Sequence, residues 1–390
     1  MSGNRLVWNR AETPAEINRM LSVLAEEYPV ADCGDGMRIR FEKIAEPGVL
    51  RMAAEPGTIV IQYGSLQAAA RGVGNALAGR TVSGDMVFKT LGIMLDCSRN
   101  AVMKVSYLRK WLRRLTLLGY NMVMLYTEDT YQLPEEPYFG YLRGRYSQKE
   151  LREIDDYAFK HGMELIPAIQ TLAHLKSIFR WPAYIGINDC EDILLAGDEN
   201  TYKLIDDIFA SLEKTLRTRV VNIGMDEAHM LGRGEYQRIH GAENRFDILL
   251  NHLKRVAQIA EKHGFECIMW GDMFFRLLGG SYYEEGAVPE RVKKMIPHNV
   301  NLIYWDYYST DKEHYLKQIE SHSAIKDNIW FAGGLWSWTG FAPHNAYSIA
   351  ATKAAFNACK EKNIKNVSTG SLQCRYNKKT YYLVYEPTGM

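Results

Sequence analysis

The sequence has almost no excess of charge of either sign. Its 47 lysine and arginine residues nearly balance its 46 aspartate and glutamate residues, which leaves a formal net charge of +1. Proteins that bind nucleic acid or anionic membranes usually present a basic surface, and this balance gives no sign of one. We therefore expect neither nucleic acid nor a membrane among the partners of this chain.

Long apolar runs and paired cysteines are also missing. No run approaches the roughly 18 apolar residues of a membrane-spanning helix, and the first residues, MSGNRLVWNRAET, lack the apolar core of a signal peptide. Since no two cysteines form a C-x-x-C pair, we expect buried, reduced thiols in a soluble, cytoplasmic protein. The six cysteines are Cys33, Cys97, Cys190, Cys267, Cys359 and Cys374.

Nucleotide and metal motifs are absent as well. Residues 226–229 spell D-E-A-H, which also occurs in nucleic-acid-dependent ATPases, but those need a phosphate loop. The nearest match, GNALAGRT, has Arg80 where lysine is required. Asp226, His229 and His174 could bind a divalent ion, but no H-E-x-x-H is present and side chains three apart at a strand end diverge. We therefore expect neither a cofactor nor a metal.

The chain does contain a regular alternation of short apolar segments and amphipathic helices from about residue 89 onward. Eight such segments separated by helices predict a (β/α)₈ TIM barrel over residues 89–390. An open doubly wound sheet is the alternative, but no G-x-G-x-x-G follows an early strand. The candidate strands are 90–98, 120–129, 163–171, 220–228, 266–273, 300–308, 329–338 and 366–371.

Both flanks of this barrel differ from it in pattern. Residues 1–88 combine helical periodicity with two short strand patterns, which predicts a small α+β domain. The last stretch, LQCRYNKKTYYLVYEPTGM, does not resemble an amphipathic helix. We therefore expect either an irregularly closed barrel or one that lacks its eighth helix. The apolar surface exposed in the second case favours a homo-oligomer.

Polar and aromatic residues gather where the candidate strands end. The active site of such a barrel lies at the carboxyl ends of its strands. Paired carboxylates suit glycoside chemistry, and indole rings stack on the faces of sugars. The strand-end residues are Arg99, Glu128, Asp129, His174, Asp226, Glu227, Trp270, Asp272, Trp305, Asp306, Tyr307, Trp336 and Trp338.

Several of these segments resemble motifs of the family 20 glycoside hydrolases, the β-N-acetylhexosaminidases, and most closely their shorter intracellular-type bacterial branch. IGMDEAH is similar to the Asp-Glu signature of that family, and LDCSRN to a first-strand motif that ends in a sugar-binding arginine. YTED, IPAIQTLAHL and IMWGDM resemble the second-, third- and fifth-strand motifs. The resemblance covers about residues 89–340, and residues 1–88 look like the small domain that precedes the barrel.

The resemblance implies an exo-acting enzyme that removes terminal β-linked GlcNAc or GalNAc with retention of configuration. In that mechanism the 2-acetamido oxygen of the sugar attacks the anomeric carbon. Glu227 would be the general acid and base, and Asp226 would orient the acetamido group. Glu128 and His174 would form a hydrogen-bonded relay behind Glu227. The substrate-binding residues would be Arg99 for the sugar hydroxyls, Trp270, Trp305 and Trp336 around the acetamido methyl, and Tyr307 or Tyr308 on its oxygen.

Two departures from the family pattern leave alternatives open. Ala168 and Gln170 replace acids of the third strand, and NVSTGSLQCRYNKK lacks the tryptophan and the acid of the eighth. The second departure favours a catalytically impaired sugar-binding barrel as the runner-up. A retaining glycosidase with two protein carboxylates is a third hypothesis. It would need an acid about 5 Å from Glu227, for instance Asp272 or Asp306.

Overall fold

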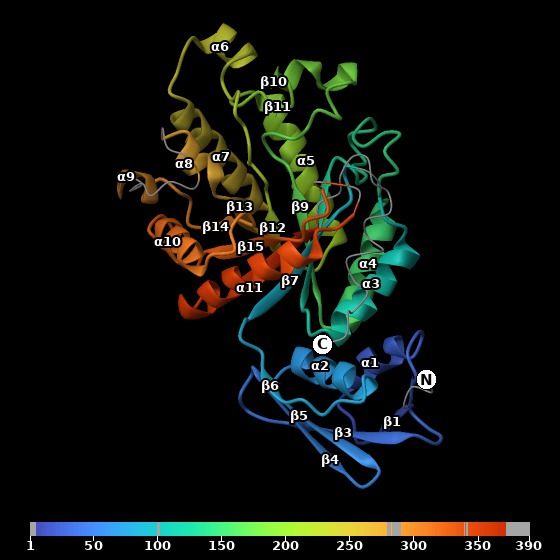
Figure 1. Ribbon diagram of the computed structural model, residues 1–390. Coiled ribbons are helices and arrows are strands. Elements are labelled where there is room, and N and C mark those ends of the chain that lie inside the picture. The colour runs from blue at the N-terminus through green and yellow to red at the C-terminus, as the bar shows by residue number, and fades with distance from the viewer. Residues whose placement is uncertain are drawn as a thin grey trace. The chain divides into compact units, whose positions relative to one another are not determined.

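The computed structural model of the protein describes residues 5–99, 102–278, 282, 290–338, 340 and 342–371. Figure 1 shows the arrangement of its helices and strands. Among the described residues, no helix combines the length and the apolar character that crossing a membrane requires.

Eight parallel strands close into a barrel, which confirms the predicted (β/α)₈ fold and excludes the open sheet (Figure 1). The ring closes where β12 pairs with β9, with Asn222 opposite Ala168. The predicted eighth strand, β16, pairs with β15 and lies beside β7 in the ring. The expectation about the eighth helix concerns residues 372–390, which lie outside the described part of the chain. The barrel strands are β7 (Thr90–Asp96), β8 (Met122–Glu128), β9 (Glu164–Ile169), β12 (Val220–Asn222), β13 (Glu266–Trp270), β14 (Val300–Trp305), β15 (Trp330–Gly334) and β16 (Asn366–Ser371).

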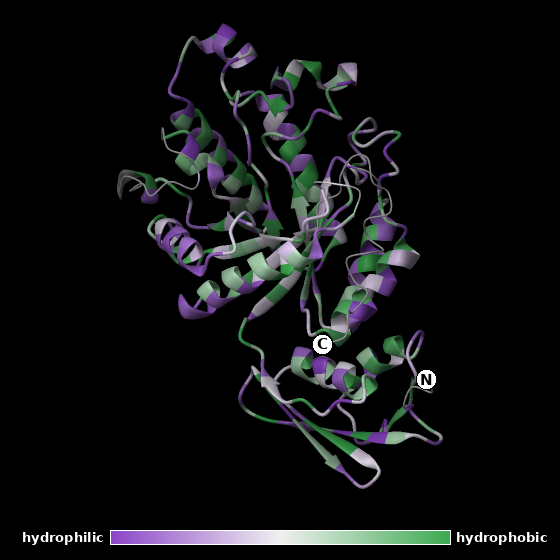
Figure 2. Ribbon diagram, in the orientation of Figure 1, coloured by the Kyte–Doolittle hydropathy of each residue, from purple (hydrophilic) through white to green (hydrophobic). Residues whose placement is uncertain are grey.

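The longer helices between these strands bury an apolar face, and Figure 2 shows the hydrophobic and hydrophilic residues along them. In α7, for example, Leu249, Leu253, Val256 and Ala260 recur at helical spacing and are buried. Its start is fixed by the Asn244 side chain, which accepts a hydrogen bond from the Phe246 amide. The helices are α3 (Val105–Leu117), α4 (Gln148–Lys160), α5 (Glu199–Thr215), α7 (Arg245–Lys262), α8 (Asp272–Arg276), α9 (Glu290–Lys293), α10 (Lys312–Ser323) and α11 (Asn345–Glu361).

Two connections that follow barrel strands contain structure of their own. The segment between β9 and α5 forms a 3₁₀ helix, η1 (Pro182–Ile187), and an antiparallel hairpin, β10 (Asn188–Cys190) and β11 (Ile193–Leu194). The segment between β12 and α7 contains the short helix α6 (Glu235–His240). Asp189 of the hairpin accepts hydrogen bonds from the amides of Gly232, Gly234 and Tyr236, so the two connections support each other.

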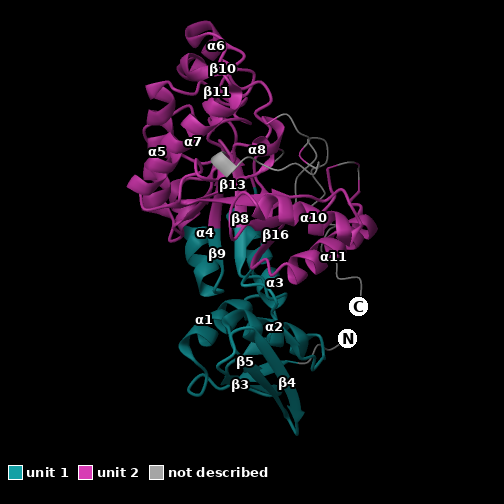
Figure 3. Ribbon diagram, turned by 90° about the vertical axis from the view of Figure 1, so that its left-hand side faces the viewer, with its two compact units in different colours: residues 1–92, 103–123, 153–165 teal, residues 93–102, 124–152, 166–390 magenta. Residues whose placement is uncertain are grey.

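The chain divides into two compact units, coloured teal and magenta in Figure 3. The first contains residues 1–92, 103–123 and 153–165, and the second contains the remainder, including the carboxyl ends of the barrel strands. Before the barrel, the first unit holds a six-stranded sheet in the order β2-β1-β3-β5-β4-β6 and the helices α1 and α2. Its elements before the barrel are β1 (Leu6–Trp8), α1 (Ala15–Leu24), β2 (Val30–Ala31), β3 (Met37–Lys43), β4 (Val49–Glu55), β5 (Thr58–Tyr63), α2 (Leu66–Leu77) and β6 (Gly84–Asp85).

The core of this sheet comes from alternate strand residues and from one face of each helix. Ile39 and Phe41 of β3 point inward while Arg38 and Arg40 are exposed. They pack in one cluster with residues of α1, such as Leu21. The helix α2 is rich in alanine because it lies close to the sheet. A Cβ added at Gly72 would come within 2.7 Å of the Ile61 side chain.

The cysteines only partly follow the expectation of buried thiols. The five that are described form no disulfide with one another, and Cys97, Cys267 and Cys359 are buried. Cys33, however, is exposed and Cys190 is partly exposed. Cys374 lies outside the described residues. The exposed position of Cys33 follows from its location in the turn before β3 and not in an apolar run.

Arg113 of α3 is a buried arginine that makes three side-chain hydrogen bonds within the first unit. Its guanidinium donates to Glu27 Oε2 at 2.7 Å, to Glu26 Oε2 at 2.8 Å and to the Tyr157 hydroxyl at 2.6 Å. Tyr157 in turn donates to Glu26 at 2.9 Å. The side chain of Arg113 is 8% exposed, whereas those of Glu26 and Glu27 are 47% and 26% exposed. One arginine therefore joins α3, α4 and the segment after α1.

We expect Arg113→Ala to lower the free energy of unfolding by about 2 kcal/mol, since Tyr157 loses a buried partner while the two glutamates regain water. Urea denaturation followed by circular dichroism measures the change. The control is Arg40→Ala, whose partners Glu42 and Glu55 are exposed, and which should cost less than about 1 kcal/mol. Equal losses in the two variants would contradict the assignment.

Candidate active site

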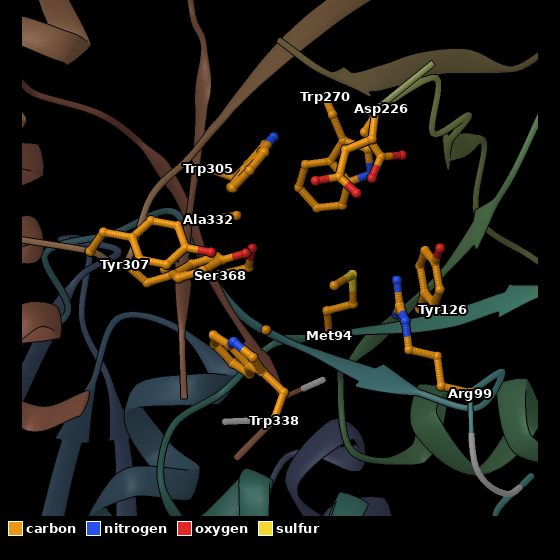
Figure 4. A pocket seen from close by; sticks show the side chains of 14 residues that line it. Met94, Arg99, Tyr126, Asp226, Trp270, Trp305, Tyr307, Ala332, Trp338 and Ser368 are labelled. Atoms are coloured by element: carbon orange, nitrogen blue, oxygen red, sulfur yellow. The ribbon is translucent and has the colours of Figure 1, made fainter. Parts of the chain in front are cut away.

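A cavity of about 240 Å³ opens at the carboxyl ends of the barrel strands, where the sequence predicted the site. Figure 4 shows carboxylates, an arginine and several indole rings converging on it. The lining residues are Met94, Arg99, Tyr126, Asp226, Glu227, Trp270, Trp305, Tyr307, Tyr308, Ala332, Gly333, Trp338, Ser368 and Gly370.

Asp226 and Glu227 lie on a turn that interrupts the predicted strand 220–228. The strand β12 ends at Asn222 because Gly224, Met225 and Glu227 have positive φ angles of 73°, 67° and 53°. Such angles are unfavourable for residues other than glycine. At Gly224 a side chain is also excluded by space, since a Cβ would come within 2.0 Å of the Gln170 side-chain oxygen. Below, residues 223–227 are called the catalytic turn.

Side-chain oxygens accept three backbone amides of the catalytic turn. Asn222 Oδ1 accepts from Gly224 N at 3.0 Å, and Gln170 Oε1 accepts from Met225 N at 3.2 Å. Asp272 Oδ2 accepts from Glu227 N at 3.1 Å. These donors can no longer pair in a regular ladder, so the side chains take the place of a neighbouring strand.

Both oxygens of Asp226 are occupied by donors. Gln170 Nε2 donates to Oδ1 at 2.9 Å, and His174 Nε2 lies 3.1 Å from Oδ2. Burial would raise the pKa of Asp226, but the charge and hydrogen bond of His174 outweigh it and the pKa is lowered. Burial alone would lower the pKa of His174, but Asp226 raises it to about 9. The two side chains therefore form an ion pair at neutral pH.

Glu227 is held less tightly at its side chain. The carboxyl group is 45% exposed, whereas that of Asp226 is 18% exposed. Its Oε2 lies 3.6 Å from His174 Nε2, beyond a hydrogen bond. Glu227 is therefore free to approach a ligand in the cavity, while Asp226 has a fixed orientation.

Glu128 connects to Asp226 and not to Glu227. Its Oε2 accepts from the Ser98 hydroxyl, and its Oε1 accepts from the Tyr126 hydroxyl at 3.0 Å. Gln170 Nε2 donates to Tyr126 at 3.2 Å and thereby links the group to Asp226. Burial raises the pKa of Glu128, although Arg99 and Ser98 oppose this. Within the described part of the chain, no hydrogen bond joins Glu128 to His174, so the network differs from the expected relay behind Glu227.

Arg99 lies at the cavity wall on the opposite side from Trp305 (Figure 4). Asp96 holds it, with Nη1 at 3.2 Å from Oδ2, and the guanidinium lies 4.8 Å from the centre of the Tyr126 ring. Burial would lower the pKa of Arg99, but Tyr126 and Asp96 raise it. The guanidinium is therefore a fixed cation that can donate to hydroxyl groups.

The aromatic wall contains three of the four aromatic residues that were expected there. Trp270, Trp305 and Tyr307 line the cavity, as does Tyr308, but Trp336 does not. Trp336 lies behind the wall, where its Nε1 donates to the Tyr307 carbonyl at 2.8 Å. Trp338 takes its place in the lining and stacks on Trp336 with ring centroids 5.4 Å apart.

Glycine at position 334 makes this wall possible. A Cβ there would come within 2.7 Å of the Tyr307 ring and 2.8 Å of the Trp338 ring. Burial raises the pKa of Tyr307, and the Tyr308 hydroxyl adds to that shift. Tyr307 therefore stays protonated and can donate a hydrogen bond into the cavity.

Several lining or supporting residues were not predicted as site residues. Gln170 and Tyr126 organise Asp226, and Met94 lines the cavity. A signal existed for two of them. Tyr126 is two residues before Glu128 on β8 and therefore shares its face, and Gln170 directly follows the last residue of β9.

The arrangement also contains one group of potential metal ligands. Ligand-type atoms of His174, Asp226 and Glu227 all lie within 4.8 Å of one another. A metal needs the neutral imidazole, whereas the raised pKa of His174 favours the protonated ring that donates to Asp226. His229, the other histidine considered, is exposed and not part of this group.

Comparison with known proteins places the chain in a family. The family model of the glycosyl hydrolase family 20 catalytic domain matches residues 88–374. Hexosaminidase D of Homo sapiens is 28% identical over 245 residues, which are 58% of this chain and 46% of that protein. Beta-hexosaminidase 3 of Arabidopsis thaliana is 24% identical over 202 residues, or 48% and 37% of the two chains. The chain thus spans about half the length, or less, of these curated relatives.

Solved structures share the fold. A family 20 exo-β-N-acetylglucosaminidase from Vibrio harveyi, in complex with N-acetylglucosamine, superposes with a TM-score of 0.69 at 14% identity and covers 96% of this chain and 66% of that one. For a family 20 β-N-acetylhexosaminidase from Streptomyces coelicolor A3(2), the TM-score is 0.66 at 17% identity, with 96% and 83% covered. Since the family model also matches most of the sequence, the chain belongs to glycosyl hydrolase family 20.

Proposed function

We propose that the protein is an exo-β-N-acetylhexosaminidase that releases terminal β-linked GlcNAc or GalNAc with retention, by a route in which the acetamido group of the substrate is the nucleophile. One observation carries this proposal. Asp226 and Glu227 are the two acids among the described residues that line the cavity, and both oxygens of Asp226 are already bonded. A fixed carboxylate suits orientation of a substrate group better than attack on it.

Glu227 supplies the proton transfers in this mechanism. Its exposed carboxyl group protonates the glycosidic oxygen as the bond to the leaving group breaks. In the second step the same group, now a carboxylate, removes a proton from the water that opens the cyclic intermediate. A group that alternates between acid and base needs a side chain that can move. This agrees with the distance of 3.6 Å between Glu227 Oε2 and His174 Nε2, which is too long for a hydrogen bond.

Asp226 stabilises the charge that the acetamido group acquires. When the acetamido oxygen attacks the anomeric carbon, the amide nitrogen becomes more positive, and an anion beside it lowers the energy of the transition state. His174 and Gln170 keep Asp226 ionised and fix its direction. The aromatic residues Trp270, Trp305 and Trp338 enclose the sugar, and Arg99 donates to its hydroxyl groups from the other side.

Among the described residues, neither acid that the two-carboxylate hypothesis named as the nucleophile faces the cavity. Asp272 and Asp306 are both fully buried, and neither is among the lining residues. Asp306 accepts from the hydroxyl of Tyr304, the ring of His314 and the amide of Tyr308. Its oxygens are therefore used inside the fold, which supports a nucleophile that comes from the substrate.

A sugar-binding barrel without turnover is the second candidate. It is favoured by the eighth strand, which contributes Ser368 and Gly370 to the cavity and no acid from the described residues of β16. The intact pair of Asp226 and Glu227 favours turnover.

We expect the protein to hydrolyse the 4-nitrophenyl β-glycosides of GlcNAc and GalNAc and not that of glucose, because glucose has no acetamido group. Release of 4-nitrophenolate measures the rates. Turnover of the glucoside, with covalent trapping by a 2-fluoro glycoside, would establish the two-carboxylate mechanism instead. If the folded protein hydrolyses none of the three substrates, the sugar-binding barrel is favoured.

Asp226→Asn should lower kcat on the GlcNAc substrate by about 100-fold or more, since charge stabilisation in the transition state is lost. The matched control is His229→Gln, which changes the last residue of the same D-E-A-H segment at an exposed position outside the cavity. Its kcat and KM should equal those of the wild type. A D226N variant with wild-type kcat would remove Asp226 from the mechanism.

Glu227→Gln should lower kcat/KM more for a substrate with a poor leaving group, such as a sugar, than for one with a good leaving group. The good leaving group, 4-nitrophenolate, departs with little protonation. We expect the loss of kcat/KM to be at least about 10-fold larger on a disaccharide of β-linked GlcNAc than on the nitrophenyl glycoside. Parallel assays of the two substrates measure the ratio. Equal losses would show that Glu227 is not the general acid.

The charge of His174 should appear in the pH dependence of stability. Its pKa in the folded protein, about 9, lies above the ordinary 6.5. The pairing of protonated His174 with Asp226 therefore stabilises the folded protein fully below about pH 6.5. This stabilisation disappears as the pH rises through about 9, with a loss in the free energy of unfolding of up to about 3 kcal/mol. Urea denaturation at both ends of this window measures it. His174→Gln should lose much less over the same window, whereas the control His298→Gln, at an exposed position, should behave like the wild type.

A further inference from the structure

The catalytic turn needs an external constraint at Glu227. With a φ of 53°, this residue occupies the left-handed region, which costs about 1–3 kcal/mol for a residue that is not glycine. Its backbone amide is held by one side chain, Asp272, at 3.1 Å. The direction in which the Glu227 side chain leaves the backbone, and hence its position in the cavity, depends on this conformation.

Asp272 is built into the interior of the barrel end. It is the first residue of α8, directly after β13, and its side chain is fully buried. The Oδ2 atom accepts a hydrogen bond from the Glu227 amide and lies 3.4 Å from Arg276 Nε. The Oδ1 atom is buried and has no hydrogen-bond partner in the described structure. A buried carboxyl group is costly, so its presence calls for a function.

Asp272 does not fit the role of a reacting group. It does not line the cavity, and its Oδ2 accepts a hydrogen bond from the backbone amide of Glu227. The mechanism proposed for Glu227 and Asp226 also contains no step that Asp272 would perform.

We propose that Asp272 is a positioning residue that fixes the left-handed backbone of Glu227 and so aims the general acid at the glycosidic oxygen. The proposal rests on the proposed function, since it needs Glu227 as the acid. An acceptor oxygen at this point is required, because the Glu227 amide points into the barrel end where a strand would otherwise pair with it. A carboxyl group suits this position because both of its oxygens can accept, so either orientation holds the amide.

The charges around Asp272 are compatible with this function at any protonation state. Burial raises the pKa of Asp272 to about 7, and Asp226 and Glu227 add to the shift, while the Glu227 amide and Arg276 oppose it. The group therefore changes its charge near neutral pH. Its carbonyl oxygen accepts the amide whether or not the other oxygen carries a proton, so the turn stays in place.

The experiment compares Asp272→Asn and Asp272→Ala with the wild type on the 4-nitrophenyl glycoside of GlcNAc. We expect Asp272→Ala to lower kcat by about 100-fold with little change in KM, since a misplacement of about 1 Å at the reacting group has such an effect. Asp272→Asn keeps an acceptor oxygen, so its kcat should lie within about fivefold of the wild type. A purely structural role would lower the folded fraction of both variants without this difference in kcat per folded molecule.

Asp189 provides the matched control, because it is also a buried carboxyl group that accepts backbone amides but lies outside the lining of the cavity. Asp189→Ala should lower the unfolding temperature and leave kcat and KM unchanged. If Asp272→Ala does not fold, Asp272→Leu replaces it, since leucine is similar in size and has no acceptor atom. Wild-type kcat in the folded Ala or Leu variant would overturn the proposal for Asp272 alone, whereas a wild type without activity on acetamido sugars would overturn it together with the proposed function.

Discussion

The candidate active site depends on the hydrogen bonds that hold the catalytic turn in left-handed conformations. Met225 and Glu227 each cost about 1–3 kcal/mol in that region, and a hydrogen bond typically contributes about 1 kcal/mol. The bonds from Gln170 to Met225 and from Asp272 to Glu227 therefore offset the strain approximately and no more. Without them the chain would continue as a strand, and alternation would send Asp226 and Glu227 to opposite faces. The irregular backbone is what allows two adjacent acids to face the same cavity.

A second set of hydrogen bonds, made to Asp226, lowers the pKa of that acid. Burial raises the pKa of two acids of the site, Glu128 and Asp272. Asp226 is the one whose pKa falls, because it has both His174 and Gln170 as donors. The donors around Asp226 therefore decide that its pKa is lowered, since Glu128 and Asp272 are buried as well and have raised pKa values. The arrangement provides a fixed anion next to a movable acid, as the proposed reaction requires.

Much of the fold could be predicted from the sequence because strand and helix periods are local properties. The eight apolar segments became the eight barrel strands, and β16 covers the predicted residues 366–371. The ends were less predictable. The segment 220–228 stops being a strand at Asn222, since the bonds that bend it come from Gln170 and Asp272, which are 55 and 45 residues away from their partners. The pattern of apolar residues within one segment does not indicate such distant partners.

The candidate site was predictable to the extent that it follows strand ends. Arg99, Asp226, Glu227, Trp270, Trp305 and Tyr307 line one cavity because parallel strands end at the same rim. Trp336 and Trp338 could not be told apart, since both follow β15 by a few residues and the choice depends on how the loop turns over Gly334. Side-chain direction outside regular structure follows from contacts and not from a period.

Gln170 shows why one amide can do what an acid at that position could not. It accepts from the Met225 amide through its oxygen and donates to both Asp226 and Tyr126 through its nitrogen. A carboxylate is an acceptor only, so it would hold Met225 but repel Asp226 unless it kept a proton. The Gln170 side chain, which does not titrate, therefore fixes both the backbone of the turn and the direction of the Asp226 side chain. The network from Glu128 through Tyr126 to Asp226 therefore keeps its hydrogen-bond directions while the neighbouring acids gain or lose protons.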